Sequence, residues 1–357
     1  MVTIIGGGLF GITTAILLSD EGYDVMILEK NFDLMTGATL INQNRVHYGY
    51  HYPRSLETGR ESLEGLSSFI NMYGTTVNNS FEKYYAISKF GSHLNADEFS
   101  SFCQNLNIPL EEKWPNEKYL NQKEIEACWL VKEPVFDYYE LRSLVLAELK
   151  KRKRIKIIRN AMISKVEMNG NYSITLNNNY EFNSDFIVNA TYSGLSDVLS
   201  LFGEEKLKAH FELLLLPVLK AKSDISTFGI TIMDGPFCSI VPKGFFKNEY
   251  ILSHVNHSVL QSHLGYNKPD WNAIEGIIEF DIIEACKKYF PILEEMSLRE
   301  SWMITKMVLP NQDIDDARPT LVLKHKENFY SIFSGKISTC VEAAKSILEK
   351  VKKNETI

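Results

Sequence analysis

The chain has 357 residues, of which 45% are hydrophobic and 23% charged, and its formal net charge is −7. This length suits two domains, or one large α/β domain with an insertion, and the apolar content is enough for a sizeable core. The negative charge argues against nucleic-acid binding, because such proteins usually present an electropositive surface. The basic run at residues 150–154 is local and is typical of the solvated end of a helix.

The cysteines and the apolar runs indicate the compartment. Five cysteines are scattered along the chain without a CxxC pair, so we expect a reducing compartment, no disulfide framework and no metal site. The chain opens on a buried-type strand rather than a signal peptide. Its longest strongly apolar run, residues 211–219, contains Pro217 and is too short to cross a bilayer. We therefore expect a soluble, cytoplasmic protein without an integral membrane segment.

The first thirty residues predict a strand, a glycine turn, a helix and a second strand. Val2–Ile5 is a continuous apolar run, as in a central parallel strand that is buried on both faces. Three glycines follow, and Leu9–Ser19 has the apolar pattern of a buried helix that Gly22 ends. Asp24–Glu29 contains the second apolar strand.

The middle of the chain departs from regular βα alternation. Gly37–Ser55 is polar and aromatic and fits neither a helix nor a strand, whereas Leu56–Tyr73 has a helical pattern. Short strands and helices are mixed from Phe81 to Trp129, and a helix is expected at Tyr139–Lys151. Further predicted strands are Lys156–Arg159, Ile163–Glu167, Tyr172–Leu176, Phe186–Asn189, Gly229–Met233 and Tyr250–Val255.

The last part of the chain returns to the pattern of the first. Residues Ala273–Tyr289 are at least partly helical, and a strand at Phe329–Phe333 leads through Gly335 into a helix at about Cys340–Lys352. We find no internal repeat and no long linker. A domain built from separated segments, with a second domain inserted between them, fits this order better than two consecutive domains.

The glycine turn carries a dinucleotide-binding fingerprint, Gly6-x-Gly8-x-x-Gly11, between a predicted strand and a predicted helix. In this motif the glycines allow the tight turn, the approach of the pyrophosphate and close helix packing, and the helix N-terminus faces the anion. Glu29 ends the second strand, where an acidic residue accepts hydrogen bonds from a ribose and disfavours a 2′-phosphate. A glycine-rich turn in an unrelated α/β protein is the alternative, and the fingerprint alone does not separate FAD from NAD.

The segment after the second strand favours FAD over NAD as the cofactor. Gly37–Ser55, which reads GATLINQNRVHYGYHYPRS and contains the His-x-Gly element His47-Tyr48-Gly49, resembles the D-amino-acid oxidase superfamily of flavoproteins. That superfamily includes glycine oxidase, sarcosine oxidase, glycerol-3-phosphate dehydrogenase and 2-hydroxyglutarate dehydrogenase. In its members this segment runs past the ribityl chain and the isoalloxazine ring.

Three further segments carry the resemblance. Residues 187–191, Ile-Val-Asn-Ala-Thr, are similar to the second FAD element of the family, although Thr191 and Tyr192 stand where Ala and Gly are usual. Arg318-Pro319-Thr320 resembles the Arg-Pro that precedes the last part of the flavin site. Residues 335–343 resemble the closing glycine turn and helix, whose N-terminus stabilises negative charge on the reduced flavin. There Lys336 either adds a positive charge or faces solvent.

The resemblance implies an α/β fold with a Rossmann-like FAD-binding domain, discontinuous in sequence, and an inserted α+β substrate domain. The FAD-binding domain would comprise residues 1–64, 131–204 and 305–357, and the substrate domain residues 65–130 and 205–304. Val166 would supply a backbone contact on the adenine side. The residues expected to bind FAD are Gly6, Gly8, Leu9, Phe10, Gly11, Glu29, Lys30, Thr39, Asn42, Arg45, His47, Val166, Ala190, Gly335, Lys336 and Ile337.

Candidate catalytic residues are His51, Arg54 and His254. His51 is either a proton acceptor or part of a hydrogen-bonded wall, because polar groups in an interior segment must be satisfied. Arg54 has no acidic neighbour in sequence, so we expect it to anchor a substrate carboxylate or phosphate. His254 and His257 either face the pocket or are structural, and no third ligand for a metal lies nearby. Some family members attach FAD covalently through His or Cys, which leaves His47 open to that role, but non-covalent binding is the default.

The function that the resemblance implies is hydride transfer from a C–N or C–O bond to flavin N5. The substrate would be a small and anionic molecule of the amino acid, amine or hydroxy acid type, and the flavin would carry the difficult chemistry. The alternatives are an NAD-linked dehydrogenase and a flavin-binding protein without redox turnover. The sequence predicts neither the substrate nor the electron acceptor.

Overall fold

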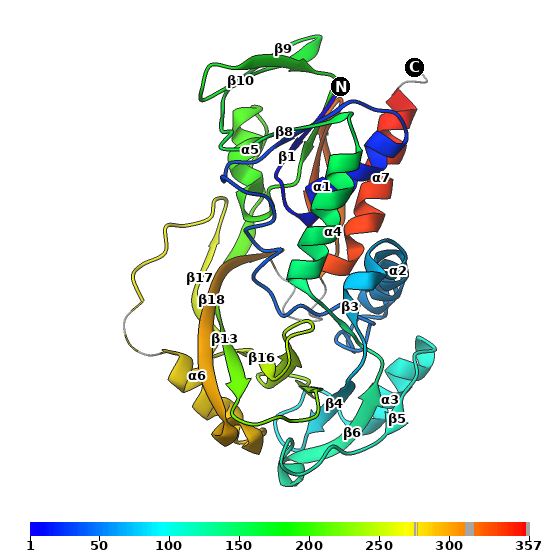
Figure 1. Cartoon of the computed structure of the whole chain (residues 1–357), viewed down its shortest axis with the longest axis vertical. Helices are drawn as coiled ribbons and strands as arrows, with labels where there is room; N and C mark the ends of the chain where they lie inside the picture. The colour runs from blue at the N-terminus through cyan, green and yellow to red at the C-terminus, as the bar shows by residue number, and fades with distance from the viewer. Residues whose placement is uncertain (275, 277, 311–317, 355–357) are drawn as a thin grey trace.

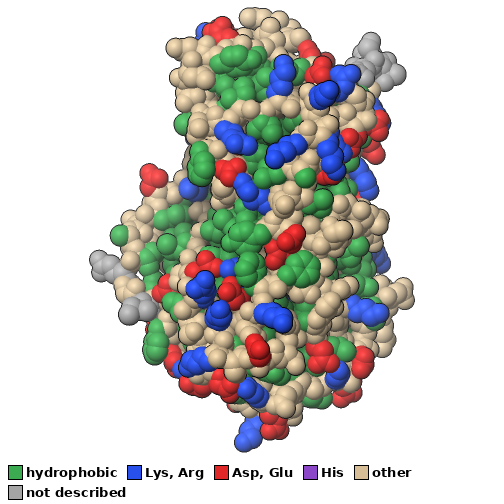
Figure 2. Space-filling model, in the orientation of Figure 1, with side chains coloured by type: hydrophobic (Ala, Val, Ile, Leu, Met, Phe, Trp, Pro, Cys, Tyr) green, Lys and Arg blue, Asp and Glu red, His purple; other side chains and the backbone are tan. Residues whose placement is uncertain are grey.

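The computed structural model describes residues 1–274, 276, 278–310 and 318–354. The molecule is elongated and has two lobes, and the first strand, β1, and the last helix, α7, both lie in the upper one (Figure 1). On the face shown in Figure 2, side chains of both charges are interspersed over the two lobes. No helix within the described ranges is both long and apolar enough to cross a membrane.

The upper lobe is built on a sheet with the strand order β19-β20-β12-β1-β2-β8. All neighbours pair in parallel except β19 and β20, which are antiparallel. The strands are β1 (Val2–Ile5), β2 (Val25–Leu28), β8 (Ile155–Ile158), β12 (Phe186–Asn189), β19 (Leu321–Lys326) and β20 (Phe329–Phe333). Strands from separated parts of the chain therefore form one sheet, as expected from the sequence.

The two faces of this sheet are covered differently. Val2 and Ile4 belong to one apolar cluster with α1, α4 and α7, whereas Ile5 belongs to another with α5 and the β9–β11 hairpins. This division follows from the alternation of side chains along a strand. The covering elements are α1 (Leu9–Asp20), α4 (Tyr138–Lys151), α7 (Cys340–Asn354), α5 (Leu195–Leu201), β9 (Ile163–Asn169), β10 (Asn171–Leu176) and β11 (Glu181–Ser184). α2 (Leu56–Tyr73) packs against α7.

The lower lobe contains a second, mixed sheet with the order β17-β13-β16-β15-β14-β4-β6-β5, and β18 pairs with β13 (Figure 1). Its strands are β4 (Glu82–Ser88), β5 (Glu111–Glu112), β6 (Ile125–Val131), β13 (Ala209–Ala221), β14 (Phe228–Met233), β15 (Cys238–Pro242), β16 (Glu249–His254), β17 (Val259–Gly265) and β18 (Met296–Val308). α6 (Ile278–Lys287) and η4 (Pro291–Glu295) pack in one apolar cluster with this sheet, and α3 (Ala96–Asn105) packs in another. A short pair, β3 (Val77–Asn78) with β7 (Val135–Phe136), and the turns η1 (Gly74–Thr76), η2 (Gln122–Glu124), η3 (Tyr192–Gly194) and η5 (Ile337–Thr339) complete the fold.

The structure confirms the predicted fold class but places the ends of elements differently from the expected domain boundaries. The boundaries after residues 64, 130 and 304 fall inside α2, β6 and β18. A boundary at the end of an element suits a packed helix or a paired strand better, because such an element packs as a whole. We propose instead that the inserted lobe comprises residues 82–131 and 209–308. The helix expected within Ala273–Tyr289 is α6, and residues 275 and 277 of that range lie outside the described residues.

Candidate cofactor and substrate site

A cavity of about 1220 Å³ lies between the two lobes. Its walls come from the carboxyl ends of β1 and β2, from the segment 35–54, from the second sheet and from residues 332–337. Ligands bind α/β sheets at the carboxyl ends of their strands, so this is the expected position for a dinucleotide. The volume is large enough for a cofactor and a small substrate together.

The three fingerprint glycines serve two different purposes. A Cβ on Gly6 would lie 2.6 Å from the Ala190 carbonyl oxygen, and one on Gly11 would lie 2.1 Å from the Gly6 carbonyl oxygen. Gly6 also has a φ of +112°, which disfavours any side chain. A Cβ on Gly8 would meet only Thr39 Oγ1, at 3.5 Å. Gly6 and Gly11 are thus required by the fold, whereas Gly8 keeps the cavity wall open where a pyrophosphate would approach.

Glu29 is buried at the end of β2 and lines the cavity. Its carboxylate accepts hydrogen bonds from the backbone N–H groups of Gly7 and Asn31, both at 2.8 Å. An ionised carboxylate has about four lone-pair positions, so acceptor capacity remains for ribose hydroxyls. Lys30, which follows it, is exposed at the rim of the cavity.

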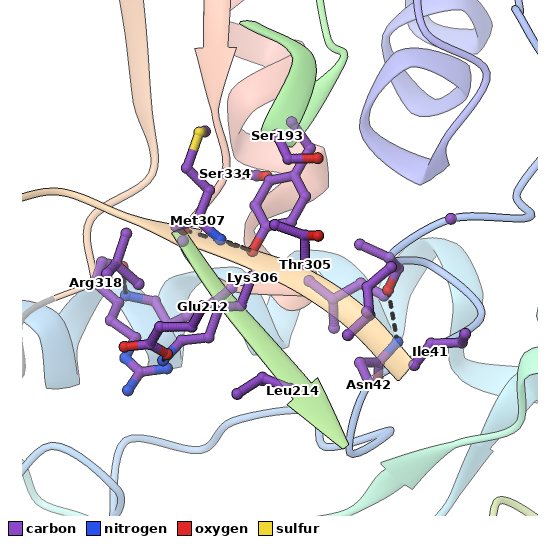
Figure 3. Close-up of a pocket in the computed structure, with 18 of the residues that line it drawn as sticks. Ile41, Asn42, Ser193, Glu212, Leu214, Thr305, Lys306, Met307, Arg318 and Ser334 are labelled. Carbon is purple, nitrogen blue, oxygen red and sulfur yellow. Dashed lines mark hydrogen bonds and ion pairs between the residues drawn. The ribbon is translucent and has the colours of Figure 1, made fainter. Parts of the chain in front are cut away.

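The segment after β2 is tied to the first helix. Thr39 Oγ1 accepts a hydrogen bond of 3.1 Å from the N–H of Leu9, in the first turn of α1. Asn42 Nδ2 donates to the carbonyls of Ala38 and Thr39, and its Oδ1 accepts from the N–H of Asn44. Figure 3 shows Asn42 beside Ile41 at the cavity wall. These bonds fix the path of the segment around the N-terminus of α1, where an anion is stabilised.

The closing turn at Gly335 forms the far end of the cavity. A Cβ on Gly335 would lie 2.2 Å from the Arg318 carbonyl oxygen, so this residue has to be glycine. Lys336 is buried rather than facing solvent. Its Nζ donates to Glu61 (3.0 Å) and to the Arg318 carbonyl (2.9 Å), and it lies 5.2 Å from the centre of the Tyr52 ring. Burial lowers the pKa of Lys336, and Glu61 opposes that shift.

Fifteen of the sixteen residues expected to bind FAD line the cavity or its turn, but Val166 does not. Val166 lies within β9 and pairs with Ile174 in the outer hairpin. Gly11 contributes through its packing on Gly6, and the remaining fourteen line the cavity directly. At the edge near Val166 the lining residues are Ala161, Met162 and Ile163. We propose instead that the backbone contact on the adenine side comes from residues 161–163, because these residues, unlike Val166, line the cavity.

A buried polar network that the sequence did not reveal lies behind the segment 43–52. Glu133 and Arg45 form an ion pair at 2.9 Å, with side chains only 1% and 2% exposed. The network also contains the Tyr85 hydroxyl, which donates to Glu133 at 3.0 Å, and Thr231, which accepts from Arg45 at 3.0 Å. Burial opposes the charge of Glu133, but Arg45, His47 and Lys83 together outweigh burial, with Arg45 the largest of the three, and they hold the pKa of Glu133 well below its usual range. The one signal in the sequence was a charged pair, Lys132-Glu133, that interrupts apolar runs before Pro134.

His47 and His51 stack on each other beside this network, with ring centres 5.4 Å apart. His47 Nδ1 lies 3.4 Å from Glu133 and must be the donor, because the partner is a carboxylate. His51 Nδ1 is buried and has no hydrogen-bond partner among the described residues. Burial lowers the pKa of both rings, and for His51 the nearby Arg45 lowers it further. Both histidines line the cavity as neutral rings.

Arg54 lies at the cavity wall but is already paired. Its Nε donates to Asp234 Oδ2 at 2.6 Å, and Asp234 lies in the turn after β14. The acid is 180 positions away in sequence, which is why it was missed. Arg54 and Asp234 together carry no net charge, so the pair presents less positive potential to a substrate than a lone arginine would.

His254 ends β16 and lines the cavity. Its Nδ1 accepts from the backbone N–H groups of Asn256 (3.2 Å) and His257 (3.3 Å), so the neutral ring carries its proton on Nε2. Burial, with a contribution from His257, lowers the pKa of His254 to about 4. Both histidines belong to a tight turn, and no cluster of three metal-ligating side chains occurs in the part of the chain that the structure describes.

A further charged wall is formed by β13 and β18. Glu212 and Lys306 are paired at 2.7 Å, and Figure 3 shows them on the same side of the cavity as Arg318. The Tyr192 hydroxyl accepts from the N–H of Met307 at 3.0 Å, which ties η3 of the upper lobe to β18 of the lower lobe. Tyr192, which stands where the family usually has glycine, thus serves as a link between the lobes.

The open surface at Gly8, the buried Glu29, the anchored Thr39 and the closing turn at Gly335 define a dinucleotide-binding site of the flavoprotein type. The same cavity continues into a chamber that is lined by residues of the second sheet, which we call the lower sheet. A family profile described as "FAD dependent oxidoreductase" (DAO) matches residues 1–331. The chain belongs to this family; it is an enzyme, and its cofactor is FAD.

Two FAD-dependent monooxygenases are similar to this chain in sequence. FAD-dependent monooxygenase FPY4 of Fusarium mangiferae is 22% identical over 358 residues, which is 98% of this chain and 90% of that protein. FAD-dependent monooxygenase kojA of Aspergillus flavus is 36% identical over 76 residues, 21% of this chain and 18% of that protein.

Two solved structures show the same fold. Glycine oxidase from Geobacillus kaustophilus has a TM-score of 0.76 at 13% identity and covers 99% of this chain and 94% of its own. L-α-glycerophosphate oxidase from Mycoplasma pneumoniae with FAD bound has a TM-score of 0.76 at 16% identity, covering 98% and 94%.

Proposed function

We propose that this FAD-dependent oxidoreductase oxidises a C–O or C–N bond of a small polar substrate held under the lower sheet. The observation that carries the proposal is the continuity of the cavity from the turn at Gly8 to the chamber lined by His51, Asp234 and His254. A ligand in that chamber would lie between the second sheet and the cofactor. When bound, FAD supplies the two-electron acceptor.

The residues that line the cavity would bind the cofactor, form the wall of the chamber or position a turn beside it. Gly8, Thr39 and Glu29 would hold the pyrophosphate and ribose, and Lys336 would place positive charge at the far end of the cofactor. His47 and His51 would form an uncharged wall of the substrate chamber, fixed by Glu133 behind them. The pair of Arg54 and Asp234 would position the turn after β14 at the chamber.

The proton acceptor would be one of the histidines that line the cavity. His254 uses Nδ1 to accept two backbone N–H groups, so it can only offer Nε2–H to a ligand. The buried Nδ1 of His51 lacks a partner within the described residues, which disfavours a charged ring there. We propose that His47 is better placed to take a proton, because Glu133 would stabilise the positive ring.

The experiment that tests this function is an anaerobic screen of alcohols, hydroxy acids and amines against the purified holoprotein. Loss of the visible flavin absorbance on mixing is the expected result for the substrate class. FAD-dependent monooxygenase FPY4 aligns with 98% of this chain, so monooxygenation is a second candidate. Substrate-driven bleaching without oxygen supports the first function, whereas consumption of substrate only when oxygen and an external reductant are present supports the second.

A further inference from the structure

Three hydroxyl side chains form a row across adjacent strands of the second sheet. Thr231 of β14 is directly opposite Ser239 of β15, and Ser239 is directly opposite Ser253 of β16. Directly paired residues project from the same face of a sheet. All three line the cavity, although they are only 2%, 5% and 7% exposed. We call Thr231, Ser239 and Ser253 the hydroxyl row.

The two serines share one hydrogen bond. Ser239 Oγ and Ser253 Oγ are 2.8 Å apart, and Gln43 Nε2 donates to Ser253 Oγ at 2.9 Å. Two hydroxyls carry two protons, and one proton is used in their mutual bond. Whichever serine donates in that bond, the other keeps a proton for which no acceptor exists among the described residues.

Thr231 adds a further hydrogen-bond donor to the hydroxyl row when Lys83 is protonated. Its Oγ1 accepts from Arg45 Nη2 at 3.0 Å and contacts Lys83 Nζ at 2.6 Å. A protonated Lys83 fills the second lone pair of Thr231, so that the threonine proton must also be donated to the cavity. Burial lowers the pKa of Lys83 well below its usual range, and a neutral Lys83 would accept that proton instead. The free proton of the serine pair does not depend on the protonation state of Lys83, so the proposal rests on the two serines.

A buried hydroxyl that cannot donate its proton is costly, at about 1–3 kcal/mol on the usual scale of lost hydrogen bonds. We propose that the hydroxyl row is a specificity determinant that donates a hydrogen bond to an oxygen of the substrate, which is a hydroxyl, carbonyl or carboxylate. This proposal rests on the proposed function to the extent that the chamber holds a substrate. An ammonium group carries donors only, so it cannot satisfy the row. A substrate whose one polar group is an ammonium is therefore disfavoured, whereas a neutral amine still offers one lone pair.

The first test is structural and needs no turnover. Crystals of the FAD-loaded protein are soaked with glycerol, a probe with three hydroxyls. We expect a glycerol oxygen about 2.6–3.0 Å from Ser239 Oγ or Ser253 Oγ, the ordinary length of such a bond. A flavin atom that accepts from the row, or glycerol bound elsewhere in the chamber with the row uncovered, would overturn the proposal.

The second test removes the serine hydroxyl donors one at a time. Ser239→Ala leaves Ser253 with its proton and with Gln43, so one donor to the cavity remains. The double variant Ser239→Ala/Ser253→Ala removes both serine donors. The quantity measured is the half-saturating concentration for bleaching by the alcohols or hydroxy acids found in the screen. We expect the single variant to stay within about twofold of the wild-type value. The double variant should need a concentration about fivefold higher or more, which corresponds to the loss of one neutral hydrogen bond.

The matched control is Ser62→Ala, which removes a buried hydroxyl of α2 that donates to Thr58 within the upper lobe. It should leave the half-saturating concentration unchanged, and thermal unfolding and flavin content verify that each variant is folded. Cyclohexylamine, an amine without an oxygen atom, is compared with cyclohexanol at a pH where the amine is protonated. Bleaching at the same total concentrations as cyclohexanol would overturn the proposed role of the hydroxyl row but leave the proposed function intact. If glycerol binds at the row and no compound bleaches the flavin, the recognition stands and the proposed function fails.

Discussion

Glu133 and Arg45 form a fully buried ion pair, 2.9 Å apart, that joins the connection after β6 to the segment lining the cavity. Removing one partner of such a pair leaves an uncompensated charge, so Glu133→Gln should lower the free energy of unfolding by ~3–5 kcal/mol. Chemical denaturation measures this. Glu82→Gln, which breaks the exposed pair with Lys113, is the matched control and should cost less than about 1 kcal/mol.

The same pair has a pH signature. The folded pKa of Glu133 is held well below that of the unfolded chain, so its contribution to stability is present above an unfolded pKa of about 4.3 and is lost as pH falls below it. The acid-side loss of stability should therefore be shallower in Glu133→Gln than in the wild type. Equal slopes in the two proteins would show that Glu133 is not ionised in the fold.

Gly8→Val should fold but bind FAD poorly. A Cβ at Gly8 meets only Thr39 in the protein, whereas the cofactor would have to share that space. Glu29→Ala should weaken FAD binding by roughly 1–3 kcal/mol, the size of a charge-assisted hydrogen bond. The ratio of flavin to protein absorbance after purification measures both. Gly11→Val is the contrasting variant: its Cβ would collide with the Gly6 carbonyl, so it should lose stability as well as flavin. Full flavin content in Gly8→Val would contradict the assignment of this turn.

Arg54→Lys tests the part that the ion pair with Asp234 plays at the chamber. If Arg54 also contacts an anionic substrate, the lysine keeps the charge but loses the planar geometry, and KM should rise more than kcat falls. Asp234→Asn should then lower KM for anions, because it removes the competing charge. Equal effects of both variants on charged and uncharged substrates would instead assign the pair to positioning the turn after β14.

The rate of flavin reduction should fall on the acid side at a pH below the pKa range of a free histidine. The pKa values of His47, His51 and His254 are all lowered, chiefly by burial, and that of His254 is about 4. An alcohol substrate that needs a histidine base should therefore show its acid limb below the ordinary value of ~6.5. Stopped-flow reduction of the wild type, His47→Asn, His51→Asn and His254→Asn measures it. We expect the largest loss in His47→Asn, while an amine substrate should keep its rate in all three variants.

The amino-acid sequence determined those parts of the protein that depend on near neighbours. The turn from Gly6 to Gly11, the acid at Glu29 and the glycine at Gly335 are short motifs whose backbone geometry is set within a few residues, and the fold places them as predicted. The same holds for the strands that were apolar on both faces, such as Val2–Ile5 and Phe186–Asn189.

The tertiary structure decided which distant side chains meet. Arg45 and Glu133 are 88 positions apart, and Arg54 and Asp234 are 180 positions apart. The hydroxyl row exists only because the pairing of β14, β15 and β16 brings Thr231, Ser239 and Ser253 into register. A shift of one residue in a strand would turn its side chain to the opposite face. The polarity of this part of the cavity is therefore set by strand register, which no local pattern in the chain specifies.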